Sequence, residues 1–172
     1  MISAPLHKTL LLLAISTLLL PSWVQGQDVP ERVDIAEQYK WDLSDMYRDT
    51  QAWEVDREKF IDALPTLERF RGQLSTDGPT LLAAIEAMQS VETIIANLYV
   101  YAGLRSYEDT RASENAARFS EAQSLYARYQ ETLSFFTPEL LAIPEHTLSQ
   151  LLASTPGLAV YNHYLKEIAR MR

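Results

Sequence analysis

Residues 77–107 decide the fold, and they read DGPTLLAAIEAMQSVETIIANLYVYAGLRSY. Asp77-Gly78-Pro79 is a helix start, because proline is favoured in the first turn, where its missing N–H has no partner to lose. Residues of one helical face then recur every three or four positions: Leu82, Ile85, Met88, Glu92, Ile95, Tyr99 and Ala102. The pattern predicts a helix that runs to about Tyr107. Such a long helix needs a neighbour of similar length to cover its face.

The next segment supplies that neighbour, because residues 113–136 read SENAARFSEAQSLYARYQETLSFF. Thr110 or Ser113 can cap a helix there, and Pro138 is expected to end it. The residues that share its apolar face are Ala116, Phe119, Ala122, Tyr126, Tyr129, Leu133 and Phe136. Two long helices joined by a short acidic turn predict an antiparallel hairpin.

A helix is also expected before the hairpin, with Thr50 as its N-cap and its end near Gly72. Its apolar face comprises Trp53, Phe60, Leu64, Leu67 and Phe70. Pro65 lies inside this pattern, so we expect the helix to bend or split there.

Shorter helices should follow the hairpin, separated by Pro138 and Pro144. Pro156-Gly157 opens the last one, whose shared face is Leu158, Tyr161, Leu165, Ile168 and Ala169. This helix continues to Arg172 with no stop signal after it, which also fits a chain cut within a structure. The predicted fold class is all-α, a long antiparallel helical hairpin within a helical bundle, preceded by a signal peptide.

The N-terminus has the layout of a secretory signal peptide. Lys8 precedes the apolar residues 10–20, and Pro21 and a short polar-leaning stretch to Gly26 follow. The apolar run is too short to span a bilayer, which needs about 20 residues, so no stable membrane span is expected. We expect cleavage near Gly26 and a periplasmic or secreted product; a buried N-terminal helix or an uncleaved anchor is the alternative. The predicted organisation is a signal peptide at 1–26, an extended leader at 27–49 that lies on the surface or on another domain, and a helical domain at 50–172.

Composition excludes several functions. The net charge is −8 and the pI is about 4.9, so binding to the phosphates of nucleic acid is not expected. The chain has no cysteine, which excludes disulfides, a thiol nucleophile and cysteine-based zinc sites. Twelve acidic residues lie between Asp28 and Glu68, but they are spread along the segment and are interpreted as solvated helix faces rather than a cation site.

No residue of this chain is predicted to be catalytic, cofactor-binding or metal-binding. A zinc peptidase helix needs H-E-x-x-H, and His7, His146 and His163 are too far apart to form it. The di-iron motif Glu-x-x-His is missing as well, as are a P-loop, G-x-G-x-x-G and G-x-S-x-G. Serine triads assemble in space and leave no fixed spacing, so only the missing elbow argues against one. We expect His146 to be exposed and His163 to be a packing residue.

Seven of the nine tyrosines lie between Tyr99 and Tyr164. They allow two interpretations, an aromatic wall for peptide or carbohydrate substrates, or a hairpin core with hydroxyls at its rim. The core interpretation is favoured, because a buried tyrosine is stable wherever its hydroxyl finds a partner.

Four segments together resemble a known family. They are KWDLSDMY at 40–47, LYVYAGLR at 98–105 running into EDT at 108–110, LSFFTPELL at 133–141 and YNHYL at 161–165. In this order they resemble the N-terminal region of oligoendopeptidase F, a zinc metallopeptidase of the thimet-oligopeptidase superfamily. The resemblance covers roughly residues 38 to 172.

The resemblance implies a helical protein of several hundred residues whose N-terminal helices form one wall of a deep channel. It also implies a zinc site on an H-E-x-x-H helix in the C-terminal part, where a glutamate activates water to cleave short peptides. This sequence has no H-E-x-x-H, so no catalytic or zinc-binding residue carries over and the chain alone is expected to be inactive. Its expected partners are short peptide substrates of the full-length parent and the missing C-terminal catalytic domain. The contrasting hypothesis is a stand-alone exported helical module that binds peptides or a protein without catalysis.

Overall fold

The computed structural model describes residues 30–171, which form parts of two units, Met1–Ile35 and Ala36–Arg172. The described part of the first unit holds one 3-10 turn, η1 (Arg32–Asp34), in which the Asp34 N–H donates to the Glu31 carbonyl at 2.9 Å. The expected signal peptide lies outside the described residues and stays a prediction, as do the domain boundaries.

The second unit begins in the segment expected to be an extended leader. It contains the 3-10 turn η2 (Glu37–Tyr39) and a turn in which the Tyr47 N–H donates to the Leu43 carbonyl. The Tyr47 ring is buried and meets the Tyr101 ring edge-on, with centroids 5.2 Å apart. Leu43, Met46 and Tyr47 therefore pack against the helices that follow, whereas Ser44 and Asp45 between them are exposed.

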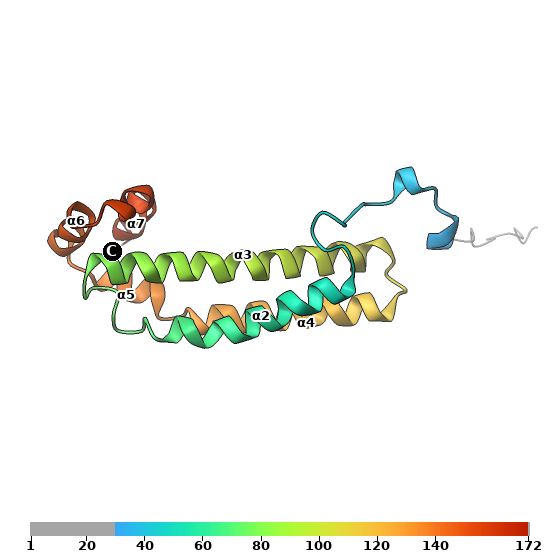
Figure 1. Cartoon of the computed structure of the whole chain (residues 1–172), viewed down its shortest axis with the longest axis horizontal. Helices are drawn as coiled ribbons and strands as arrows, with labels where there is room; N and C mark the ends of the chain where they lie inside the picture. The colour runs from blue at the N-terminus through green and yellow to red at the C-terminus, as the bar shows by residue number, and fades with distance from the viewer. Residues whose placement is uncertain (1–29, 172) are drawn as a thin grey trace, which may run out of the picture. The chain divides into compact units, whose positions relative to one another are not determined.

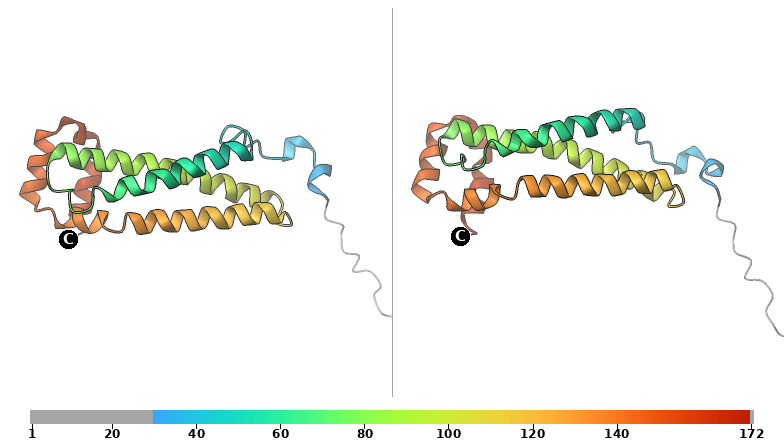
Figure 2. Two further views of the ribbon diagram at one scale, coloured as in Figure 1. Left: turned by 60° about the horizontal axis from the view of Figure 1, so that its bottom comes forward. Right: turned by 90° about the horizontal axis from the view of Figure 1, so that it is seen from below.

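Three long helices lie side by side in this unit: α2 (Thr50–Glu68), α3 (Gly78–Glu108) and α4 (Ser113–Thr132) (Figure 1). The further views in Figure 2 agree on this arrangement and show α5 to α7 gathered at the end where α3 begins. The antiparallel hairpin of α3 and α4 is confirmed. So is the all-α class for residues 30–171, in which no strand occurs.

The caps of α2 and α4 differ from those expected, whereas α3 begins where the sequence predicts. Asp49, not Thr50, caps α2, because its extended backbone lets the side chain accept from the Ala52 N–H at 2.8 Å. Asp77 caps α3 in the same way through the Thr80 N–H. The N-cap position of α4 is Ala112, so neither Thr110 nor Ser113 takes that role.

Two prolines sit differently from the prediction. Pro65 does not split α2, which is continuous to Glu68, and the proline is exposed in its last turns. Pro138 does not end α4. That helix stops at Thr132, and Pro138 lies in the first turn of the next helix, where its missing N–H costs no hydrogen bond.

The C-terminal part is a layer of short helices: α5 (Phe136–Ala142), α6 (Glu145–Ser154), the 3-10 turn η3 (Pro156–Tyr161) and α7 (Asn162–Ala169). This layer packs closely on the start of α3. A Cβ added at Gly78 would lie 1.8 Å from Thr155 Oγ1, and one added at Gly157 would lie 2.5 Å from Leu82 Cδ2. At Gly78 a side chain would collide with Thr155, and at Gly157 the Leu82 side chain would have to move aside.

Two hydrophobic clusters result, and α3 contributes to both. The proximal cluster joins the start of α3 to the short helices and is mainly aliphatic; it includes Leu81, Ile85, Phe136, Leu140, Leu158 and Leu165. The distal cluster lies among α2, α3 and α4 and is rich in aromatic rings; it includes Tyr47, Trp53, Phe60, Leu98, Tyr101 and Tyr129.

One described helix, α3, is long and apolar enough to cross a membrane by length and composition. This is weak support for a membrane span, because the core helix of a soluble protein meets the same criteria. Here α3 packs against both α2 and α4, and the expectation of no membrane span stays a prediction.

Candidate functional site: the aromatic seam of α3 and α4

One side of the α3–α4 hairpin is closed by α2. The fully buried Trp53 donates its indole N–H to the Leu98 carbonyl at 3.1 Å, and the Arg118 guanidinium lies 5.8 Å from the Trp53 ring centroid. Arg57 adds ion pairs to Glu54 on its own helix at 2.7 Å and to Glu121 on α4 at 3.5 Å. Apolar contact and charge together hold α2 in place against the hairpin.

A row of aromatic rings follows the junction of the two hairpin helices, and we call it the aromatic seam: Tyr99, Tyr107, Phe119, Tyr126 and Tyr129. Neighbouring rings lie 5.3 to 6.4 Å apart between centroids, in edge-on or tilted arrangements that such rings prefer. Ring contacts therefore connect the seam continuously along α3 and α4.

The seam is only partly covered. Tyr129 is buried and Tyr99 and Phe119 are half-buried, whereas Tyr126 is 43% exposed and Tyr107 64% exposed. The core interpretation of the tyrosines therefore fits Tyr129. The outer rings present their surface to solvent, as the wall interpretation requires.

Gly103 brings the two helices of the seam together. A Cβ there would lie 3.2 Å from Phe119 Cε2, so the missing side chain lets the Phe119 ring approach the α3 backbone. A glycine in the middle of a helix costs helix stability, and this contact gives it a packing reason.

Glu92 continues the seam toward the start of α3. It lies seven residues before Tyr99 and so shares its helical face. One turn earlier, Gln89 Oε1 accepts a hydrogen bond from the Tyr161 hydroxyl at 2.9 Å, which fixes η3 beside this part of α3. Tyr164, three residues on, is 37% exposed.

The carboxylate of Glu92 acts on two nearby phenols. Burial raises the pKa of Tyr129 and of Tyr164, and the negative charge of Glu92 raises both further. Glu92 itself is an exposed carboxylate without an ion pair among the described residues.

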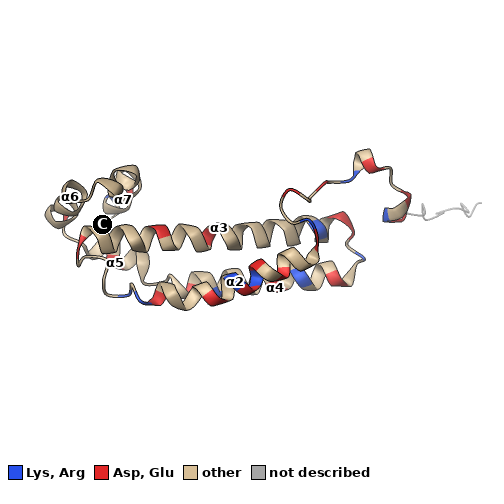
Figure 3. Ribbon diagram, viewed as in Figure 1, with Lys and Arg blue, Asp and Glu red and all other residues tan. Residues whose placement is uncertain are grey.

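The charges of the unit are unevenly placed. Figure 3 shows acidic and basic residues concentrated on α2 and α4, while most of α3 is neutral. The α3 side of the seam is therefore mostly neutral, and the negative charge of Glu92 on this helix raises the pKa of Tyr129 and of Tyr164.

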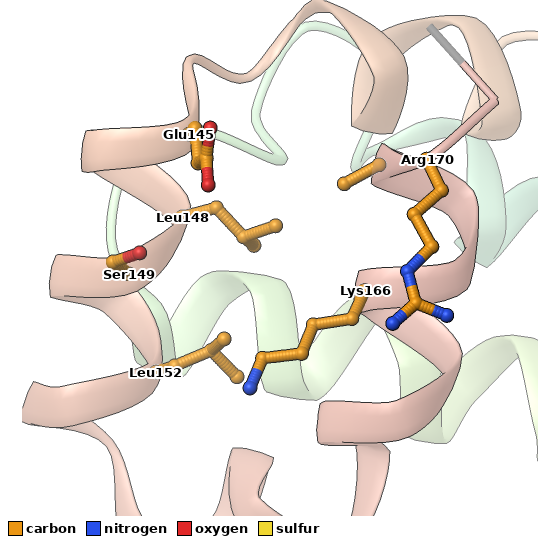
Figure 4. A pocket seen from close by; sticks show the side chains of 7 residues that line it. Glu145, Leu148, Ser149, Leu152, Lys166 and Arg170 are labelled. Carbon is orange, nitrogen blue, oxygen red and sulfur yellow. The ribbon is translucent and has the colours of Figure 1, made fainter.

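Apart from the seam, a hollow with a volume of about 450 Å³ lies between α6 and α7. Figure 4 shows Leu148 and Leu152 on one wall and the long side chains of Lys166 and Arg170 reaching in from the other. Arg170 is hydrogen-bonded to Glu167 on its own helix. The hollow combines an apolar floor with two cations and the carboxylate of Glu145, and no histidine lines it.

His146 and His163, the two histidines in the described part of the chain, do not assemble a metal site. His146 is exposed at the start of α6 beside Thr147, as expected. His163 is exposed as well, so its prediction as a packing residue is wrong: the buried face of α7 carries Leu165 and Ile168, and position 163 points the opposite way.

Zinc, which the family resemblance implies, does not fit the side chains present. Within the described part of the chain, no group of three or more His, Asp or Glu residues lies close enough together to hold a metal ion. No catalytic step is therefore derived through a metal on these residues.

Comparisons with known proteins agree on one family. The model of a peptidase family described as Oligopeptidase F matches residues 139–172. Group B oligopeptidase PepB of Streptococcus agalactiae is 30% identical over 80% of this chain and 23% of its own length. Oligopeptidase PepF of Bacillus subtilis is 26% identical over 86% of this chain and 22% of its own length.

A solved structure gives the same answer. The crystal structure of oligoendopeptidase-F from Enterococcus faecium superposes with a TM-score of 0.66 at 29% identity, over 70% of this chain and 23% of that chain. The helical bundle is thus of a class found in peptidases. The chain belongs to the oligoendopeptidase F family and corresponds to the N-terminal region of its members. This confirms the resemblance found in the sequence. It spans about a quarter of the length of the curated relatives it matches.

Proposed function

We propose that this chain forms an N-terminal helical wall of an exported zinc oligopeptidase that hydrolyses short peptides. The observation that carries the proposal is the match to oligopeptidases in sequence and in fold, which extends over most of this chain and about a quarter of theirs. The curated relatives are named as oligopeptidases, and their activity is what we assign to the parent of this chain.

The seam gives this wall a surface suited to peptides. Aromatic rings bind the apolar parts of side chains and offer hydroxyls at their edges for backbone groups. Tyr126 and Tyr107 present such surface on the side of the hairpin that α2 leaves open. A peptide lying along α3 and α4 would meet rings over much of its length.

Zinc and the catalytic glutamate would come from residues outside these 172, since the sequence has no H-E-x-x-H. The contribution of this chain is then binding and the exclusion of water, without a step of the chemistry. Alone it is expected to be inactive.

Export is part of the same proposal and is supported by the sequence of residues 1–26. The mass of the protein recovered from the periplasm or the medium tests it. We expect a chain that begins near Gln27, and a mass that retains residues 1–26 would overturn this part of the proposal.

Activity assays test the assignment itself. The gene product that contains this sequence should hydrolyse short fluorogenic peptides and lose turnover with a chelator. The 172-residue chain incubated with zinc and the same peptides should show none. Two outcomes would overturn the assignment. One is chelator-sensitive turnover by the 172-residue chain, and the other is a gene product that has no H-E-x-x-H motif and no peptidase activity.

A stand-alone exported module that binds peptides is the second candidate, and the exposed seam favours it too. It differs from the first in needing no zinc. A gene product that binds peptides but does not hydrolyse them would favour this stand-alone module.

A further inference from the structure

We propose that the hollow between α6 and α7 binds a short peptide of two or three residues whose amino and carboxyl ends are both free. The site lies on other elements than the aromatic seam and requires no hydrolysis, so the inference goes beyond the proposed function. It rests on the charges and the apolar surface that line the hollow.

The hollow carries opposite charges on its two walls. Glu145 is the first residue of α6, whereas Lys166 and Arg170 reach in from α7 and the residue that follows it (Figure 4). Glu145 lies at one end of the hollow, and the Lys166 ammonium lies toward the other end, beside Leu152. A ligand with an ammonium group at one end and a carboxylate at the other matches this order of charges.

The charges at the two ends have no partner of their own. Neither Glu145 nor Lys166 forms an ion pair within residues 30–171. The other two lysines in this range, Lys40 and Lys59, are both paired, at 2.6 and 2.8 Å between nitrogen and carboxylate oxygen. Arg170 is already bound to a carboxylate of its own helix. One unpaired charge of each sign favours a ligand that carries both signs over a simple anion or cation.

The separation of the two charged ends selects the length of the ligand. Glu145 and Leu152 are seven residues apart on α6, which corresponds to about 10 Å along the helix axis. Two or three residues of an extended peptide cover about 7 to 10 Å. A single amino acid carries its ammonium and its carboxylate on the same carbon atom, so it does not reach both ends.

The floor of the hollow suits an apolar side chain. Leu148 is buried, Leu152 and Ala169 are half-buried, and all three line the hollow. Its volume of about 450 Å³ lies within the range of small-ligand sites. Ser149 adds a hydroxyl that can hydrogen-bond a peptide group. A leucine in the middle of a tripeptide would therefore cover the floor while its two ends reach the charges.

Both walls are fixed by the core beneath them. The proximal cluster contains Leu148 and Leu151 of α6 and Leu165 and Ile168 of α7. The two helices are thus held in place before any ligand arrives. Binding then has to order only the long charged side chains, which lowers its entropic cost.

The experiment measures binding of short peptides to the 172-residue chain by NMR titration at low salt, where ion pairs are least screened. The first peptide is Ala-Leu-Ala with free ends. Its N-acetyl form lacks the ammonium, and its C-terminal amide lacks the carboxylate. We expect each block to weaken binding about twofold to fivefold, the effect of one exposed ion pair. Free leucine should bind more weakly than the tripeptide.

Variants assign each end of the peptide to one residue. Glu145→Gln should remove the effect of acetylation and keep the effect of the amide. Lys166→Gln should reduce the effect of the amide and keep the effect of acetylation. Glu58→Gln and Lys59→Gln, both at exposed positions of α2, are the matched controls and should change neither effect.

Equal binding of the free and blocked peptides, or no detectable binding, would overturn the inference. So would end-group effects that are unchanged in Glu145→Gln or in Lys166→Gln. Weakening by the amide alone would indicate a site for anions, and leucine that binds as tightly as the tripeptide would indicate a site for amino acids; either result contradicts the proposal.

Circular dichroism of each variant shows whether the helices are intact. None of these measurements depends on turnover, so their failure is distinct from a gene product that lacks peptidase activity.

Discussion

The two sides of the α3–α4 hairpin use aromatic residues in opposite ways. On the side closed by α2, Trp53 is fully buried and its N–H is satisfied by the Leu98 carbonyl. On the open side, Tyr126 contacts rings on both helices and still leaves 43% of its surface to solvent. Trp53 comes from α2 and Tyr126 from α4, and both are large aromatic side chains that contact α3.

The difference in exposure between Trp53 and Tyr126 separates rings that stabilise the fold from rings that are free for binding. A ring that is buried with its polar atom satisfied stabilises the fold, whereas a half-exposed ring in a row adds little to stability and presents a surface. This distinction is quantitative and can be tested by mutation.

The largest expected effect is at Trp53. Trp53→Ala should lower the free energy of unfolding by about 3–5 kcal/mol, because it leaves a cavity and removes the partner of the Leu98 carbonyl. Tyr126→Ala should cost about 1 kcal/mol. Urea unfolding followed by far-UV circular dichroism measures both, and equal losses would mean that the two sides do not differ.

Alkaline pH should weaken the fold through the buried tyrosines. Burial raises the pKa of Tyr129 above its unfolded value, so the unfolded chain loses its phenol proton first. Stability is therefore full below about pH 10 and falls above it, by about 1.4 kcal/mol per pH unit for each such group, until the folded pKa is reached.

Tyr129→Phe should flatten this alkaline loss, measured by urea unfolding at several values of pH between 9 and 11. Tyr39→Phe is the control, because Tyr39 is 73% exposed and contributes no burial. An unchanged slope in Tyr129→Phe would show that this phenol does not control the loss.

A smaller effect is expected at the start of the covering helix. Asp49→Ala removes the side chain that accepts from the Ala52 N–H and should cost about 1 kcal/mol. Asp49→Asn keeps an oxygen at the same place and should be nearly neutral. Equal losses of stability in the two variants, measured by thermal unfolding, would argue against a capping role for Asp49.

The smallest expected change is on the open side, at Glu92. Glu92→Gln should lower the pKa of Tyr164, because the carboxylate raises it, although burial, the larger cause, keeps it above the ordinary value. Unfolding free energy should stay within about 0.5 kcal/mol. NMR titration of ring-labelled tyrosine measures the pKa; a value that does not move would mean that Glu92 lies farther from the ring.

The sequence predicts α3 well because its signals are local. Asp77-Gly78-Pro79 marks the start, and the structure places the cap at Asp77 and the end at Glu108, close to the expected Tyr107. At the start of α2, Asp49 and Thr50 are both good capping residues. Only the extended backbone of Asp49 decides between them.

Tertiary packing explains what the sequence does not show. The face predicted for α3 includes Leu82 and Met88, which are half-buried, whereas Leu81, Val91 and Leu98 are buried. The reason is that α2, α4 and the short C-terminal helices all pack on α3 and widen the buried arc beyond one stripe. A single periodic pattern does not say how many neighbours a helix has.

The candidate site is visible in the sequence only as a cluster of tyrosines. Spacing on α3 places Glu92 and Tyr99 on one face, but the approach of Tyr164 depends on how α7 returns to α3. The same return leaves His163 on the outside of α7. Neither outcome follows from local periodicity.

The length of α3 has a mechanical consequence. Its 31 residues, at about 1.5 Å each, make a rod of about 46 Å whose first turns are clamped in the proximal cluster and whose later turns are clamped in the distal one. Gly78 and Gly157 tighten the first clamp by letting backbone and side chain come into contact. Because α3 is stiff, a force on the short helices tilts it as one body, and the far end of the seam moves with it.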